Sequence, residues 1–326
     1  MVAADESKTR GRIGWGVRLA LSGLVLTVIF SLVPLRDVFA AIRNVEPRDW
    51  LVALVVFLIG HVISAAKWQL LADSGAGFPA VLRAHFGGLV ANLSLPGVAG
   101  GDVVRAGLLY RRVADKRRLA VGSVADRLID TLGLLLIAAV GLLLALPLFA
   151  SGIHLLTSIG ILLAASAVGA IVAVRFYPRL LRRLPANGRL RRIGEQLGGG
   201  VQALLAQPLQ LALCLALSMA VQVAFIAVNI MLATAAGVDV PIAAWFFAWP
   251  LSKLIATLPI SVGGLGVREA SLAGFLAPFG AAPTAVIATG LLWQTILLAA
   301  GLLGGLTLLV SGRVLAPKTD MGSNGT

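Results

Sequence analysis

Long apolar stretches without any charge alternate along this chain with short segments that carry most of its charges. Residues 131–174, 197–238 and 270–312 contain no Asp, Glu, Lys or Arg. About 20 consecutive apolar residues span the hydrocarbon core of a bilayer as a helix, and each of these stretches is longer. No segment between the apolar stretches is long enough to fold as a soluble domain. The pattern therefore predicts an all-α integral membrane protein.

The apolar pattern predicts about six full transmembrane helices. We expect them at 19–35, at 50–71, twice within 131–174 with a turn at Pro147 and Ser151-Gly152, at 208–235 and at 283–310. A cleaved signal peptide is the alternative for the first helix, but Arg36 and Asp37 are unfavourable beside the cleavage site that this requires. Residues 19–311 then form one transmembrane domain between a cytoplasmic N-terminal basic segment (1–18) and a cytoplasmic tail (312–326).

The charge distribution sets the expected orientation. The chain has a net charge of +13, is 59% hydrophobic and is only 13% charged, where soluble domains carry about 25% charged residues. Its basic residues gather before the first span, in 83–118, in 175–192 and at the end. The positive-inside rule places these groups, and with them both termini, in the cytoplasm. Sidedness thus explains the basic excess, and we expect no nucleic-acid partner.

Cysteine and histidine are too scarce for metal or cofactor chemistry. Cys214 is the single cysteine, and the three histidines are widely spaced, so neither a disulfide nor a metal site is expected. No cofactor is predicted. On the second span, Lys67 is expected to extend its amine towards the interface. His61 is interpreted as a hydrogen-bonded core residue in preference to a proton relay.

Two interrupted apolar stretches, 78–109 and 241–279, contain an internal repeat. Leu95-Pro96-x3-Gly100-Gly101-x2-Val104-Arg105 recurs as Leu258-Pro259-x3-Gly263-Gly264-x2-Val267-Arg268 at a constant offset of 259 − 96 = 163. The repeat motifs occupy 92–105 and 255–269. Proline breaks a helix and paired glycines permit a tight turn or close approach. Such backbone is tolerated in hydrocarbon only where protein or a water-filled cavity satisfies it.

Three predicted spans separate the two copies, and an odd number of spans reverses the chain direction. The copies are therefore expected to enter the membrane from opposite faces, as in inverted-repeat transporters. We interpret each copy as a broken or re-entrant helical hairpin. A kinked span is the alternative for both copies, and a pair of crossings is a further alternative for the second.

Charged residues within apolar stretches are the candidate site residues. Asp126-Arg127-x2-Asp130 puts Asp126 and Asp130 on one helix face, and Arg127 can pair with Asp130. Arg268-Glu269 lies between long uncharged stretches, and Lys253 precedes the second break. An ionisable group inside a bilayer costs about 2.5–3.5 kcal/mol and usually faces a cavity or another charge. These groups therefore either bind a lipid headgroup or pair with one another.

Together these motifs carry a family resemblance. Asn92-x3-Pro96 with Gly100-Gly101-Asp102-x2-Arg105, then Asp126-Arg127-x2-Asp130, then Pro259-x-Ser261-x-Gly263-Gly264-x-Gly266-Val267-Arg268-Glu269, resemble the lysylphosphatidylglycerol synthase transmembrane family. The resemblance implies a flippase-like domain that moves lipids such as aminoacylated phosphatidylglycerol between leaflets. Members with two parts carry a soluble synthase domain, so a stand-alone member without aminoacyl transfer is expected here. Asp126 stands where the family has Glu.

The function that we predict is therefore a non-enzymatic lipid transporter of the bacterial cytoplasmic (inner) membrane. Its substrate would be a phospholipid or other polar-headgroup lipid, anionic and aminoacylated phospholipids included, and a separately encoded lipid synthase is an expected partner. The alternatives are an intramembrane transferase that uses a lipid carrier and a regulatory subunit of a separate lipid-modifying enzyme. The predicted substrate-contacting residues are Asn92, Pro96, Gly100, Gly101, Asp102, Arg105, Asp126, Arg127, Asp130, Lys253, Pro259, Gly263, Gly264, Arg268 and Glu269.

Overall fold

The structure is a computed structural model that describes most of the apolar part of the chain. The described residues are 35–72, 75–94, 99–110, 113, 115–148, 198–199, 202–257 and 264–312. They form helices and contain no strand, which confirms the predicted all-α class. Most of the span expected at 19–35, the second span expected within 131–174, and Pro96, Pro259 and Gly263 lie outside them.

Four described helices are long and apolar enough to cross a membrane. They are α3 (Pro47–Ala72), α6 (Lys116–Ala145), α9 (Pro208–Ala235) and α12 (Pro283–Gly312). Proline at the first position of α9 needs no hydrogen-bond partner for its nitrogen, so it starts that helix without loss. The carboxylate of Asp115 accepts the N–H groups of Arg117 and Arg118 and starts α6. A short helix, α2 (Leu35–Arg43), precedes α3 and packs against α12.

Two pairs of shorter helices occupy the interrupted stretches. The first pair is α4 (Phe78–Ser94) and α5 (Ala99–Tyr110), and the second is α10 (Ile242–Thr257) and α11 (Val267–Leu276). At about 1.5 Å per residue, each is shorter than the roughly 30 Å of a hydrocarbon core. Within each pair the two helices pack against each other. Two single 3-10 turns, η1 (Leu146–Leu148) and η2 (Ala277–Phe279), follow α6 and α11.

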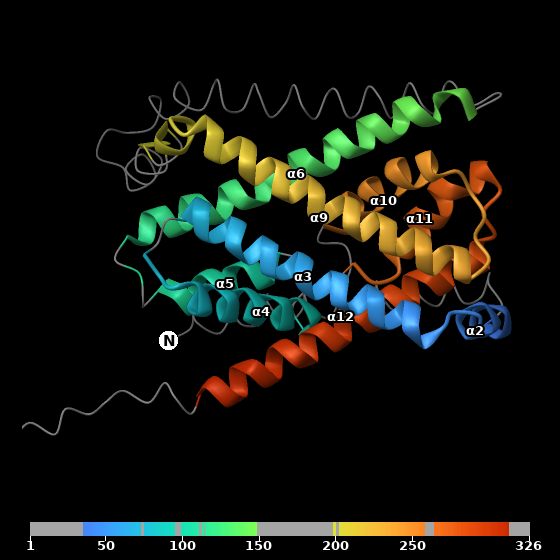
Figure 1. Cartoon of the computed structure of the whole chain (residues 1–326), viewed down its shortest axis with the longest axis horizontal. Coiled ribbons are helices and arrows are strands. Elements are labelled where there is room, and N and C mark those ends of the chain that lie inside the picture. Colours follow the sequence, from blue (N-terminus) through green and yellow to red (C-terminus); the bar gives the residue numbers. More distant parts are fainter. Residues whose placement is uncertain are drawn as a thin grey trace, which may run out of the picture.

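The two halves of the chain follow the same order of long, short, short and long helices. The ends of α3 and α9 are 235 − 72 = 163 residues apart, and the ends of α4 and α10 are 257 − 94 = 163 apart. This is the offset of the sequence motif. In Figure 1, α3 runs from right to left and α9 from left to right, and α6 and α12 also run oppositely. The α4–α5 pair lies in the left half and the α10–α11 pair in the right half.

The halves interlock through close helix contacts. The first helix of each short pair packs against a long helix of the other half, α4 against α12 and α10 against α6. Small residues permit these approaches: a Cβ at Gly141 would meet the backbone of Phe246 on α10. An aromatic group from α3, α9, α10 and α12 fills the centre, with Phe57, Phe225 and Trp249 all in ring contact with Trp293.

Candidate functional site

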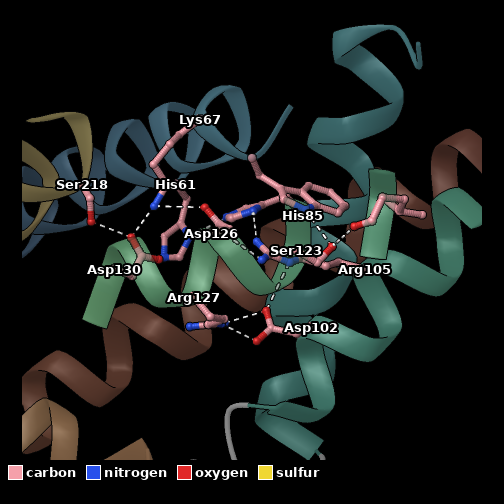
Figure 2. Close-up of polar contacts among 12 residues, drawn as sticks. His61, Lys67, His85, Asp102, Arg105, Ser123, Asp126, Arg127, Asp130 and Ser218 are labelled. Atoms are coloured by element: carbon pink, nitrogen blue, oxygen red, sulfur yellow. Dashed lines mark hydrogen bonds and ion pairs between the residues drawn. The ribbon is translucent and has the colours of Figure 1, made fainter. Parts of the chain in front are cut away.

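Six charged side chains from three helices meet in the first half of the chain. Figure 2 shows these side chains reaching toward one another from α3, α5 and α6. We call this group the six-charge cluster; its members are Lys67, Asp102, Arg105, Asp126, Arg127 and Asp130. Three cations face three carboxylates, so the cluster has no formal net charge.

Asp126 is the centre of the six-charge cluster. Its Oδ2 accepts a 2.6 Å hydrogen bond from Nη2 of Arg105, and its Oδ1 lies 3.0 Å from Nζ of Lys67. Lys67 is 1% exposed and also binds Asp130. The expectation that Lys67 extends to the interface is therefore wrong. Asp126 and Asp130 lie one helical turn apart and present two carboxylates to the same amine, which holds it inside the protein.

Arg127 pairs with a different helix from the one expected. Its Nε and Nη2 donate to the two carboxylate oxygens of Asp102 on α5, the Nη2 bond being 2.6 Å long. The Arg127–Asp130 pair predicted from spacing is not formed. Asp130 instead accepts hydrogen bonds from Lys67 and from Oγ of Ser218, the latter at 2.6 Å. A carboxylate on a separate helix can meet the planar fork of a guanidinium with both oxygens, which explains the preference for Asp102.

The glycine and asparagine of the first motif hold α4 and α5 together. The N–H of Gly101 donates to Oδ1 of Asn92 at 2.8 Å. A Cβ at Gly101 would collide with this side chain and with the carbonyl oxygen of Gly88, so only glycine allows the approach. Gly100 lies beside it in the first turn of α5. The contact places Arg105, one turn further on, against Asp126.

The second motif forms an ion pair within a single helix. Nη2 and Nε of Arg268 lie 2.5 and 3.1 Å from Oε1 of Glu269, and Oε2 of Glu269 accepts the N–H of Gly266 at 2.8 Å. Nη2 of Arg268 also donates to Oε1 of Gln294 at 3.4 Å. Gly264 and Gly266 both have φ of +77°, which explains why glycine recurs in the turn before α11.

Lys253 differs from the cations described above in its partners. Its Nζ donates to Oε1 of Gln222 at 2.8 Å and lies 5.6 Å from the centre of the Phe225 ring. Within the described residues no carboxylate lies within ion-pair distance of Lys253. By contrast, each of the four cations described above has a carboxylate partner: Lys67, Arg105, Arg127 and Arg268. Among the described residues, the amine of Lys253 thus has an amide oxygen and an aromatic ring as partners and no carboxylate.

The predicted site residues fall into separate groups. The described part of the chain shows no hydrogen bond or ion pair between the six-charge cluster and the Arg268–Glu269 pair. Sequence reasoning missed Ser218, Gln222 and Gln294, which supply the neutral polar contacts. Ser218 and Gln222 lie one turn apart in a mostly apolar span, and that spacing was the available signal. It also missed His85, whose Nε2 lies 3.0 Å from Nδ1 of His61.

Comparison with known proteins agrees with the motif resemblance. The family described as the lysylphosphatidylglycerol synthase TM region matches residues 15–305. The chain belongs to this family. It is also similar to a UPF0104 membrane protein of Methanothermobacter thermautotrophicus, with 24% identity over 315 residues that cover 86% of this chain and 89% of that protein. Like the lysylphosphatidylglycerol synthase TM region, the protein is therefore a multi-pass membrane protein, and a lipid-related role is consistent with its family.

Proposed function

We propose that this protein is a lipid flippase that moves a polar-headgroup lipid between the two leaflets. The observation that carries the proposal is a set of charged side chains that gather between apolar long helices and the two pairs of short helices, with Lys253 lacking a carboxylate partner among the described residues. Charges so placed are costly and rare unless they serve a transported group or a mechanism. The membership in the lysylphosphatidylglycerol synthase transmembrane family supports a lipid as that group.

The polar groups match the two ends of a phospholipid headgroup. Lys253, Arg105 and Arg268 would bind the phosphate, since guanidinium and ammonium groups form strong charge-assisted bonds to phosphate oxygens. Asp102, Asp126, Asp130 and Glu269 would bind an amine-bearing headgroup, Arg127 would orient Asp102, and the acyl chains would stay in the bilayer. When the phosphate of the lipid replaces a carboxylate as the partner of a cation, that cation stays paired throughout the passage of the headgroup. The interrupted motifs, with Asn92, Pro96, Gly100, Gly101, Pro259, Gly263 and Gly264, would shape the headgroup path.

The arrangement of the two halves supplies a route for alternating access. We propose that they form an inverted repeat, with α4–α5 and α10–α11 as re-entrant hairpins that enter from opposite faces. Opposite directions of equivalent helices and the shared 163-residue offset support this. Rocking of one half against the other would expose the headgroup site to each leaflet in turn.

The proposed topology has both termini in the cytoplasm of a bacterial cell. With Cys214 replaced by Ala, a cysteine at Asp239 in the exposed turn before α10 should react with an impermeant thiol reagent in intact cells. A cysteine at Lys116, exposed at the start of α6, should react only after lysis. The reverse labelling pattern would invert the proposed orientation.

Lipid exchange in liposomes tests the function directly. The purified protein should accelerate exchange of fluorescently labelled phosphatidylglycerol, measured by dithionite quenching. Lys253→Met should slow exchange about tenfold or more, because a hydrogen bond to a charged group contributes about 1.5–3 kcal/mol and 1.4 kcal/mol is a factor of ten. The matched control Lys116→Met removes an exposed lysine and should exchange at the wild-type rate.

Rates equal to those of empty liposomes would contradict the proposal, provided that the protein is folded and that anionic, zwitterionic and aminoacylated lipids have all been tried. That result would favour the lipid-carrier transferase or the regulatory subunit. A lipid synthase gene beside this one, with its product among the lipids exchanged, would identify the expected partner.

A further inference from the structure

Two histidines at the centre of the protein form a hydrogen-bonded pair that the proposed lipid path does not use. Nδ1 of His61 on α3 lies 3.0 Å from Nε2 of His85 on α4. At about 1.5 Å per residue, His61 is roughly 21 Å from the start of α3 and 17 Å from its end, near the middle of this helix. His85 is 8% exposed, and His61 is half-buried against the ring of Phe57.

The contacts of the pair fix which ring nitrogens carry protons. Nη1 of Arg105 lies 3.5 Å from Nδ1 of His85. Arginine only donates hydrogen bonds, so Nδ1 of His85 accepts and its proton sits on Nε2. This Nε2–H then donates to Nδ1 of His61, whose own proton sits on Nε2. The hydrogen bonds therefore all point the same way, from Arg105 through His85 to His61.

The pair also joins the two polar regions of the protein. At one end, Arg105 is bound to Asp126 of the six-charge cluster. At the other end, the His61 ring lies 6.0 Å from the ring of Phe225, over which the amine of Lys253 is placed. No hydrogen-bond partner for Nε2 of His61 is present among the described residues. That nitrogen is the open end of the chain of hydrogen bonds.

We infer that His61 and His85 form a proton relay, so that the protein couples lipid movement to proton movement. The inference rests on the proposed flippase function. A proton arriving at Nδ1 of His85 lets Nε2 of His85 pass its proton to Nδ1 of His61, and Nε2 of His61 releases its proton. One proton enters and one leaves, and both rings end neutral with their protons on Nδ1. Reorientation of the two neutral rings restores the starting state, so that each cycle moves one proton in one direction.

Arg105 closes the relay while it stays beside His85. Within the described residues, four cations and two carboxylates on the packed helices surround the two rings. The cations are Lys67 on α3, Arg105 on α5, Arg127 on α6 and Lys253 on α10, and the carboxylates are Asp126 and Asp130 on α6. These cations repel an incoming proton, and Arg105 occupies its acceptor. A lipid phosphate that draws Arg105 away frees Nδ1 of His85 and leaves the Asp126 carboxylate to attract the proton. Protons then pass only when lipid does.

The wild-type protein allows a test that needs no substitution. It is reconstituted in liposomes of equal parts phosphatidylcholine and phosphatidylglycerol, with a pH-sensitive dye trapped inside and labelled phosphatidylglycerol as tracer. An imposed pH difference should shift the steady distribution of the tracer between leaflets by twofold or more. In liposomes of an uncharged galactolipid, which has no phosphate to draw Arg105 away, the same protein should pass no more protons than empty liposomes do.

The variant His85→Gln tests the role of His85 in proton transfer while keeping its hydrogen bonds. The glutamine oxygen can still accept from Arg105 and its amide can still donate to His61, but it cannot pass a proton through. We expect tracer exchange at equal pH within twofold of wild type, with the response to a pH difference lost. His154→Gln, which changes the remaining histidine, is the matched control and should keep both. Thermal unfolding in detergent verifies that each variant is folded.

The outcomes separate the two proposals. Tracer exchange that ignores the pH difference in wild type overturns the relay and leaves the flippase function standing. A pH response that persists in folded His85→Gln also overturns the relay. Absence of tracer exchange from wild type with every lipid overturns the flippase function, and the coupling falls with it.

Discussion

The two halves of this protein share an order of helices but hold their buried charges in different ways. In the first half, the arginine of the motif pairs across helices, since Arg105 on α5 binds Asp126 on α6. In the second half, the equivalent Arg268 pairs with its neighbour Glu269 within α11. The first arrangement ties three helices together, whereas the second satisfies its charges inside one short helix.

This difference indicates that the two pairs of short helices are held in place with different strength. Movement of α5 away from α6 must break two ion pairs of the six-charge cluster at once, Arg105–Asp126 and Arg127–Asp102. Movement of α11 carries the Arg268–Glu269 pair along intact and breaks only the weaker contacts of Arg268 with α12, at 3.4 and 3.5 Å. We therefore expect the first hairpin to be the anchored one and the second to be the more mobile one.

The largest effect should come from Asp126→Asn. This change removes the shared partner of Arg105 and Lys67, and breaking a buried pair from one side costs about 3–5 kcal/mol. We expect a loss of this size in the free energy of unfolding, measured by denaturation in mixed detergent. Asp239→Asn, at an exposed aspartate, is the control and should change little. Equal stability of the two variants would show that the ion pairs of Asp126 do not hold the helices of the first half together.

Arg268→Gln should have a somewhat smaller effect, of about 3 kcal/mol, because Glu269 keeps its bond from the Gly266 N–H. The double change Arg268→Gln with Glu269→Gln should restore most of that stability, since replacing both members of a buried pair is often nearly neutral. The same thermal and chemical unfolding measurements apply. If the double variant is no more stable than the single one, Arg268 and Glu269 depend on partners outside α11. The two halves would then not differ in how they pair their charges.

Substitution of Gly101 tests how closely the first hairpin is packed. Gly101→Ala forces a Cβ against Asn92 and the Gly88 carbonyl, and overpacking of this kind costs about 1–3 kcal/mol. Gly107→Ala lies on the same helix with no atom within 4 Å of its Cβ and should be neutral or stabilising. The difference in melting temperature between the two variants measures the contact. A Gly101→Ala protein as stable as Gly107→Ala would show that the hairpin is loose.

The smallest effect should come from the cap of α6, outside the membrane. Hydrogen bonds from the backbone N–H groups of Arg118 and Arg117 hold the pKa of Asp115 below its usual value. The carboxylate therefore stabilises the folded state above the pKa of the unfolded chain, and this stabilisation is lost as the pH falls through the lower folded pKa. Asp115→Asn should flatten the dependence of melting temperature on pH below about 4. An unchanged pH profile would show that the cap is open in solution.

Sequence alone predicted α3, α9 and α12 closely, but it started the span after the first motif at Thr131, whereas α6 begins at Lys116. It predicted the buried charges without their partners. α9 has the bounds expected from its apolar run, because a proline and a turn delimit it. The partners of Lys67 and Arg127 were not predictable, since cross-helix pairing depends on which faces meet. Spacing within one helix indicated Arg127 with Asp130, and only the packing of α5 against α6 brings Asp102 closer. For Arg268, the adjacent Glu269 was predictable and is the partner observed.

The balance of charges in the six-charge cluster determines which part of the protein responds to membrane voltage. The electrostatic energy of a group with no net charge does not change when the group moves as a whole through a uniform electric field. The same holds for the neutral Arg268–Glu269 pair. Lys253, which contacts Gln222 and the Phe225 ring but no carboxylate among the described residues, is the exception among these groups. Carrying one charge across a potential of 100 mV changes the energy by about 2.3 kcal/mol. The resting potential of a cell would therefore pull on the second half through Lys253 and favour one position of its hairpin over the other.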